Sequence, residues 1–118
     1  MKHILFFLIL FCSVATVSAQ NDYYLKQAQS YQREAEYYIK QAQGYEREVE
    51  YYNQKAQGYL REAEYYSKHQ KYDRVRSYQQ YAKNATDSAE SYQRKAKNAR
   101  ENAQSYMRKA EDALRRAK

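Results

Sequence analysis

Apolar positions between Tyr24 and Tyr66 recur with a seven-residue period. Tyrosine occupies one position of each heptad, and from Ala28 onward a small residue, Ala or Val, lies three residues before it. The alternating steps of three and four residues are typical of a coiled-coil seam with Ala at position a and Tyr at position d. A Tyr-Tyr dipeptide also recurs every fourteen residues, at every second heptad. We therefore expect one long amphipathic helix over this stretch.

The segment that starts at Tyr78 keeps the heptad period with a different composition. Position a is Ala throughout, whereas position d alternates between Tyr and Ala, so that Tyr recurs every fourteen residues. Alanine at position a lets two helices approach closely and favours tight, antiparallel pairing. The principal seam residues expected to pack between helices are Ala28, Tyr31, Ala35, Tyr38, Ala42, Tyr45, Ala56, Tyr59, Ala82, Ala89, Tyr92, Ala96, Ala103, Tyr106 and Ala110.

The two heptad patterns are out of phase, because Tyr66 and Tyr78 are twelve residues apart instead of fourteen. On a straight helix, at about 100° per residue, the second seam would lie roughly 160° away from the first. Either one continuous helix carries seams on opposite sides, or the chain turns within Ser67–Arg76 and forms an αα-hairpin. The absence of Gly and Pro from this segment argues against a turn, whereas the nearly equal halves favour it. We favour an all-α hairpin with a helix over residues 20–68, a turn or phase break over 69–76 and a helix over 77–118.

Residues 1–19 have the pattern of a secretory signal peptide. Lys2 and His3 precede a short apolar run, and small residues end the segment at Ala19. The run is too short to span a bilayer as a helix, and no other candidate transmembrane segment follows. We expect cleavage between Ala19 and Gln20 and a secreted, extracellular protein, with an uncleaved anchor as the alternative.

The composition beyond residue 19 argues against a globular core. The apolar residues are almost entirely Ala and Tyr, and the single cysteine, Cys12, lies in the signal segment, so that no disulfide is expected. Long helices that bury a narrow seam fit this composition. Residues 20–68 carry seven Lys and Arg against eight Asp and Glu, whereas residues 69–118 carry thirteen against six. The basic half is expected to attract polyanions or acidic matrix surfaces.

Catalytic and ligand-binding motifs are missing from the sequence after the signal segment. His69 is its only histidine, and it contains neither a glycine-rich phosphate loop nor metal-ligand spacing. We therefore expect a non-enzymatic protein without a cofactor or metal ion. Nucleic acid as a partner conflicts with the secretory signal.

A second set of tyrosines lies outside the seam, at position c of alternate heptads and about 21 Å apart along a helix. Exposed aromatic rings on a regular pitch usually mark a contact surface. Two compatible interpretations are open: lateral packing between hairpins, and covalent modification by oxidation, hydroxylation or dityrosine cross-linking. These tyrosines are Tyr23, Tyr37, Tyr51 and Tyr65.

The tripeptide Asn84-Ala85-Thr86 is an N-glycosylation sequon. Such a sequon matters only in a secreted chain, which the signal segment predicts. Asn84 falls at position c, on the solvent side of the expected helix, where a glycan would fit. Asn84 is therefore a candidate glycosylation site.

The signal peptide combined with Ala/Tyr heptads resembles secreted structural proteins of invertebrates. The Ala-rich seam from Ala82 to Ala117 is similar to that of coiled-coil silks, and the abundance of tyrosine with Lys and Gln resembles byssal, adhesive and shell-matrix proteins. The resemblance implies a protein of an extracellular matrix, fibre, adhesive or biomineral, in which tyrosines are often modified. The chain departs from acidic mineral-binding proteins in being basic, which argues against direct calcium binding.

We therefore expect copies of the chain to associate with one another, or with related coiled-coil matrix proteins, through the Ala/Tyr seams. Such a seam should not hold one long helix alone, so helicity is expected to rise with protein concentration. The alternative is a secreted basic amphipathic helix that binds membranes or polyanions, as defence peptides do, although Ala is a poor membrane anchor.

Overall fold

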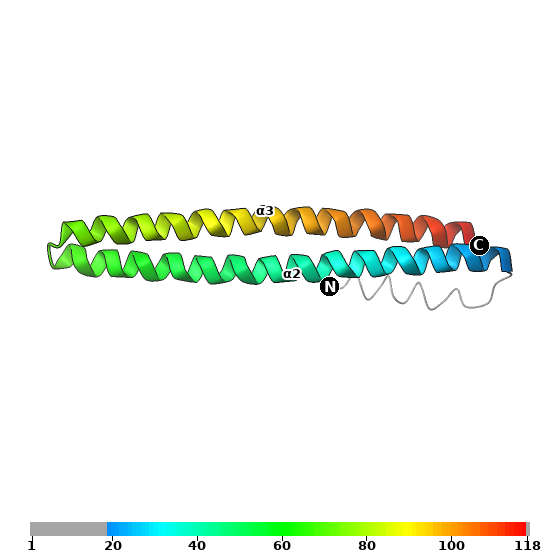
Figure 1. Cartoon of the computed structure of the whole chain (residues 1–118), viewed down its shortest axis with the longest axis horizontal. Coiled ribbons are helices and arrows are strands. Elements are labelled where there is room, and N and C mark those ends of the chain that lie inside the picture. The colour runs from blue at the N-terminus through cyan, green and yellow to red at the C-terminus, as the bar shows by residue number, and fades with distance from the viewer. Residues whose placement is uncertain (1–18, 118) are drawn as a thin grey trace. The chain divides into compact units, whose positions relative to one another are not determined.

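The computed structural model describes residues 19–117, with side chains from Asn21 onward, and they form two long helices (Figure 1). Helix α2 spans Ala19–Lys68 and helix α3 spans Tyr72–Ala117, and no strand occurs within this part of the chain. The expected all-α fold with a break between the two heptad patterns is confirmed. The expected signal peptide, residues 1–19, lies outside the described residues apart from Ala19.

The two helices contribute to two units. The hairpin unit contains Ile39–Arg100, in which the second part of α2 and the first part of α3 run antiparallel on either side of the turn (Figure 1). The terminal unit contains residues 19–38 of α2 and residues 101–117 of α3. Within each unit the two helical segments contact one another through tyrosine rings, which fixes the pairing of α2 with α3 in that unit.

The alanines of the seam form the buried layer of both units. Their small side chains allow two helix backbones to approach closely. Val49, which occupies position a in one heptad of α2, is only half-buried. The seam alanines with 0 to 7% of their surface exposed are Ala28, Ala35, Ala42, Ala56, Ala63, Ala82, Ala85, Ala89, Ala96, Ala99, Ala103, Ala110, Ala113 and Ala117.

The buried layer is wider than a strict a/d seam. In the terminal unit, Leu25 at position e packs against Ala28 and Leu114, and Gln32 at the next e position is buried. In the hairpin unit, Ile39 at position e is buried as well. A helix of a globular protein commonly adds position e to its a/d stripe, which the narrow interpretation of the sequence did not include.

The turn of the hairpin unit is shorter than expected. It comprises residues 69–71, so that α3 begins at Tyr72 and the last five residues of the expected segment 69–76 are already helical. The N–H of Gln70 donates to the carbonyl of Ser67 at 3.1 Å, and the N–H of Lys71 donates to the carbonyl of Tyr66 at 2.9 Å. This pair of hydrogen bonds is the Schellman arrangement that satisfies the last carbonyls of a helix.

Gln70 adopts a left-handed backbone conformation, with a φ of 60°. Glycine is the usual residue at this position of a Schellman turn, because a side chain there costs about 1–2 kcal/mol. The absence of Gly from the segment therefore did not preclude a turn. The two closing hydrogen bonds offset the conformational cost at Gln70.

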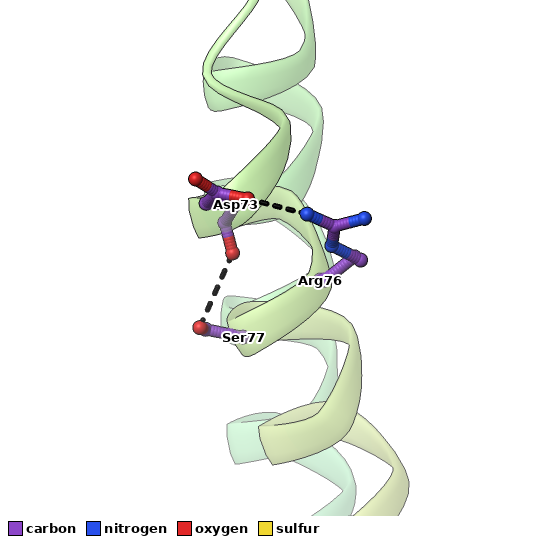
Figure 2. Close-up of polar contacts among 3 residues, drawn as sticks. All are labelled: Asp73, Arg76 and Ser77. Carbon is purple, nitrogen blue, oxygen red and sulfur yellow. Dashed lines mark hydrogen bonds and ion pairs between the residues drawn. The ribbon is translucent and has the colours of Figure 1, made fainter.

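Asp73 organises the first turn of α3. Its carboxylate pairs with Arg76, and its backbone carbonyl accepts a hydrogen bond from the Ser77 hydroxyl at 3.2 Å (Figure 2). A carboxylate in the first turn interacts favourably with the helix dipole. Lys71, the residue immediately before α3, has no side-chain acceptor that could cap the helix. Asp73 therefore supplies the favourable charge at this helix end.

Candidate functional site

Three interhelical tyrosine triads hold α2 and α3 together, and in each one a ring of α3 lies between two rings of α2. In the terminal unit, Tyr106 contacts Tyr31 and Tyr38, with ring centroids 6.2 and 5.7 Å apart. In the hairpin unit, Tyr92 contacts Tyr45 and Tyr52 at 6.0 and 5.8 Å. The third triad, Tyr78 with Tyr59 and Tyr66, has distances of 6.2 and 5.5 Å.

The different tyrosine periods of the two helices explain the triads. Tyrosines at d of α2 are seven residues apart, or about 10.5 Å along the helix axis, which leaves room for one ring between them. At its d positions, helix α3 supplies a ring only every fourteen residues, so that these tyrosines fill alternate intervals. The intervening d residues of α3 are alanines, including Ala85 in the hairpin unit and Ala113 in the terminal unit.

Cationic side chains flank all three triads. In the third triad, the guanidinium group of Arg74 lies 5.2 Å from the ring centroid of Tyr66. The ammonium group of Lys95 lies 4.9 Å from the ring centroid of Tyr92, and that of Lys109 lies 4.8 Å from the ring centroid of Tyr106. A lysine over an aromatic face is attracted by the ring quadrupole. At the third triad the equivalent residue is Tyr81, whose ring lies 5.7 Å from that of Tyr78. Tyr81 therefore extends this triad to four rings.

The tyrosines at position c of α2 form what we call the exposed row. These residues are 50 to 64% exposed, and each forms an edge-to-face pair with the ring of the next residue, at centroid distances of 5.1 to 5.4 Å. The edge-to-face contact is a favoured aromatic geometry and orients each ring. Their modification stays a prediction. The exposed row consists of Tyr23, Tyr37, Tyr51 and Tyr65.

Three further large side chains are exposed that the sequence interpretation did not single out. Tyr72 is 60% exposed, Leu60 is 54% exposed and Tyr81 is 50% exposed. Tyr72 and Tyr81 lie outside the d positions of α3, and this departure from the seam was the available signal. The aromatic surface of the hairpin unit is consequently larger than the exposed row alone.

Two ionisable groups in the hairpin unit are perturbed by their tyrosine neighbours. Burial raises the pKa of the Tyr78 phenol above its ordinary value of 10.0, and the nearby Tyr66 adds to the effect. A side-chain hydrogen bond with Tyr51 raises the pKa of Lys55, whose ammonium group lies 5.2 Å from the Tyr51 ring centroid. Both shifts favour the protonated forms of these groups.

The sequon lies on an exposed part of α3. The amide oxygen of Asn84 accepts a hydrogen bond from the Gln80 amide at 2.9 Å, and the Thr86 hydroxyl donates to the carbonyl of Ala82 at 3.0 Å. Asn84 is exposed, as a glycosylation site requires. Its glycosylation stays a prediction. At the expected cleavage site, Ala19 and Gln20 form the start of α2.

Residues 19–117 contain neither a candidate metal site nor a candidate membrane span. No three His, Cys, Asp or Glu side chains in that range gather closely enough to hold a metal ion. The ring of His69 instead packs against that of Tyr65, with centroids 4.4 Å apart. Neither described helix offers an apolar stretch long enough to cross a bilayer.

Comparison of the chain with protein-family models, with curated proteins and with solved structures gives no match. The resemblance to silk-, byssus- and shell-matrix-like proteins therefore stays an expectation carried by composition and period. The exposed row and the tyrosine triads are the features from which a function can be inferred.

Proposed function

We propose that the protein is a secreted, non-enzymatic structural protein. Its copies associate side by side into an extracellular matrix, a fibre, an adhesive or the organic matrix of a biomineral. The exposed row is the observation that carries this proposal. Four rings, each at least half exposed, recur on one helix at a fixed pitch. Such a surface is costly for an isolated soluble helix and is typical of a contact surface.

Association is assigned to the exposed row rather than to the Ala/Tyr seams. Within each unit the seam alanines are already buried and the seam tyrosines of α2 already contact those of α3. A seam that joined separate chains would have to give up these contacts. Because each chain supplies its own partner helix, we now expect helicity to persist when copies separate, in place of the concentration-dependent helicity expected from the sequence.

The contacts proposed between copies are individually weak. An aromatic pair contributes about 0.5–1.5 kcal/mol beyond the area that it buries. Four rings on one helix act together, however, and linked weak contacts can raise the overall affinity by orders of magnitude. Association is therefore expected to be reversible in dilute solution and extensive at high concentration.

The most direct test replaces all four tyrosines of the exposed row by serine. Serine already occupies position c at Ser30, so the substitution is compatible with α2. Sedimentation velocity over a range of concentrations should show association of the natural protein and strong weakening in the variant. The matched control replaces four exposed glutamines by serine, at Gln54, Gln57, Gln79 and Gln104. Equal association of the natural protein and the tyrosine variant would contradict the proposal.

The exposed phenols also support covalent curing, which we include in the proposal. Dityrosine formation removes one hydrogen atom from each of two rings and forms one carbon–carbon bond between them. A peroxidase using hydrogen peroxide would accept the two electrons and two protons and release water. Mass spectrometry on protein from its native source should show tyrosine-linked peptides that contain Tyr23, Tyr37, Tyr51 or Tyr65. Unmodified tyrosines would remove this covalent step and leave the non-covalent association.

A second candidate function is binding to polyanions or acidic surfaces. The observation that favours it is the concentration of positive charge in residues 69–118, the part of the chain that contains α3. Binding to heparin or to anionic vesicles that survives moderate salt would support it. Elution from heparin at low salt would contradict it and leave structural association as the better proposal.

A further inference from the structure

A shallow depression lies over Ala85 in the hairpin unit. It has a volume of about 240 Å³ and is lined by side chains from both helices. Two seam tyrosines of α2, Tyr52 and Tyr59, contribute to its wall together with Tyr81 of α3, and Lys55 and Ser88 also line it. Ligand sites for drug-sized molecules usually enclose 300–1,000 Å³. The depression is therefore of a size suited to a single ring.

The depression lies between two successive d-position tyrosines of α2 at a place where α3 supplies no d-position tyrosine ring. The interval between Tyr45 and Tyr52 holds the ring of Tyr92, and the interval between Tyr59 and Tyr66 holds the ring of Tyr78. Between Tyr52 and Tyr59 the facing d residue is Ala85, whose methyl group supplies no ring, and the depression remains beside the ring of Tyr81, which contacts that of Tyr59 at 5.6 Å. All three intervals span seven residues of one helix and have the same axial length.

We propose that this depression binds the phenol ring of an exposed-row tyrosine from a second copy of the chain. The inference rests on the proposed self-association and specifies where the rings of the row dock. In the adjacent intervals a tyrosine ring supplied by α3 contacts two rings of α2, one stacked and one tilted, at centroid distances of 5.5 to 6.2 Å. The proposed contact therefore continues an interaction that the chain already uses internally.

The charges around the two surfaces are complementary. A glutamate immediately precedes three of the four exposed-row tyrosines, at Glu36, Glu50 and Glu64. The depression has Lys55 on its wall. A docked tyrosine would bring its neighbouring carboxylate towards this ammonium group, which adds a favourable but salt-sensitive interaction.

The terminal unit has a smaller depression at an equivalent position, with a single tyrosine of α2 in its wall. A depression of about 160 Å³ there is lined by Tyr31, Ala113, Lys109 and Arg116. Each of these residues is twenty-eight positions from its equivalent in the hairpin unit, which are Tyr59, Ala85, Tyr81 and Ser88. A depression therefore accompanies the d-position alanine in both places, but only the one over Ala85 has two tyrosines of α2 in its wall.

Glycosylation of Asn84 would compete with ring docking, because Asn84 also lines the depression over Ala85. A glycan on this side chain would cover the opening from which a ring enters. Protein that lacks the glycan is therefore the appropriate material for testing the depression.

The first test uses p-cresol, which has the ring and hydroxyl of a tyrosine side chain. In the natural protein, kept dilute enough to be monomeric, titration should produce a saturable change in the chemical shift of the Ala85 methyl group, because the ring current of a docked ring alters the magnetic field at this methyl. The expected dissociation constant is on the order of 1 mM, as for a single small ring. The Ala82 methyl, which does not line the depression, provides the internal comparison. No saturable shift at Ala85 would overturn the proposal.

The second test fills the depression from within. Ala85→Tyr copies the pattern at Tyr78 and Tyr92 and should place a ring of the same chain in the open interval. The variant should remain helical, lose p-cresol binding and associate about tenfold more weakly than the natural protein, since one aromatic contact is worth a factor of about ten. Gln104→Tyr adds a ring at an exposed position of α3 away from the depression and is the matched control.

The outcomes separate this inference from the proposed function. Unchanged association of Ala85→Tyr, together with weakened association of the four-serine variant, would leave the structural function standing and overturn ring docking at Ala85. If the natural protein does not associate at any concentration, the proposed function fails. Docking of a tyrosine from a second copy is then overturned as well, even if p-cresol binds in the depression. Weaker association of Ala85→Tyr and of the four-serine variant would support ring docking at Ala85 and the proposed structural function.

Discussion

The ring of Tyr106 stacks on the ring of Tyr38, with their centroids 5.7 Å apart and their planes 12° from parallel. The equivalent pairs in the hairpin unit, Tyr92 with Tyr52 and Tyr78 with Tyr66, have planes within 13° and 16° of parallel. The same contact recurs because both helices carry a fourteen-residue period. It makes the α3 tyrosines the residues that fix which heptads of the two helices face each other.

Replacing an α3 seam tyrosine should therefore be more damaging than replacing an exposed one. Tyr92→Ala removes a ring that contacts both Tyr45 and Tyr52, and we expect it to lower the free energy of unfolding by about 2–3 kcal/mol. Urea denaturation followed by circular dichroism measures the change. The control, Tyr72→Ala, removes a ring that is 60% exposed and should change stability by no more than about 0.5 kcal/mol. Equal effects would show that the triads do not stabilise the pairing.

The seam should tolerate no larger side chain at its fully buried positions. Ala42 is fully buried, and Ala42→Leu is expected to cost about 1–3 kcal/mol through overpacking. Gly44→Ala, two residues away, should have the opposite effect, because a methyl group at Gly44 meets no other atom within 4 Å. The gain expected from helix propensity is about 0.8–1.0 kcal/mol. Thermal denaturation of the two variants distinguishes a packed face from an open face of α2, and a stabilising Ala42→Leu would be inconsistent with the seam.

Glycine should stabilise the hairpin unit at Gln70 of the turn but not at a helical position. Gln70→Gly relieves the left-handed conformation and is expected to stabilise the hairpin unit by about 1 kcal/mol. The same substitution at the exposed, helical Gln57 should destabilise it by a similar amount. Chemical denaturation of both variants gives the two signs. Destabilisation by Gln70→Gly would indicate that residues 69–71 do not form this turn.

Stability should decline in alkaline solution. The pKa of Tyr78 is higher in the folded chain than its ordinary value of 10.0, so folding favours the protonated phenol. This contribution is complete below pH 10 and is lost as the pH rises through the folded-state pKa. Lys55, whose pKa is also raised, contributes in the same direction.

Denaturation midpoints measured between neutral pH and pH 11 test this expectation. Tyr78→Phe keeps the ring but removes the ionisable hydroxyl, so the decline should be shallower in the variant. Identical pH profiles for the variant and the natural protein would show that Tyr78 does not contribute.

Much of the fold could be predicted from the sequence because its heptad period is regular. The a/d steps correctly identified the buried alanines, and the two-residue slip between Tyr66 and Tyr78 correctly indicated a reversal of the chain. The turn itself was harder to place, since Gln70 occupies a position at which glycine is the usual signal. The early start of α3 at Tyr72 follows from this short turn.

The tyrosine triads could not be predicted from either helix alone. Their formation depends on the register between α2 and α3, which neither helix determines by itself. The alternation of Tyr and Ala at position d of α3 was visible, but its consequence, filled and open intervals between α2 rings, requires both helices. The exposed row, by contrast, followed directly from the position of its tyrosines outside the seam.

The most direct test of the central claim, that the seams pair within one chain and leave the exposed row for association, is the helicity of the monomer. Circular dichroism and sedimentation should be measured on the same samples while the natural protein is diluted until it no longer associates. We expect the mean helicity to stay constant as the copies separate, because α2 and α3 remain paired through contacts such as Tyr92 with Tyr52. A loss of helicity that parallels dissociation would show that the seams join separate chains and would contradict the claim.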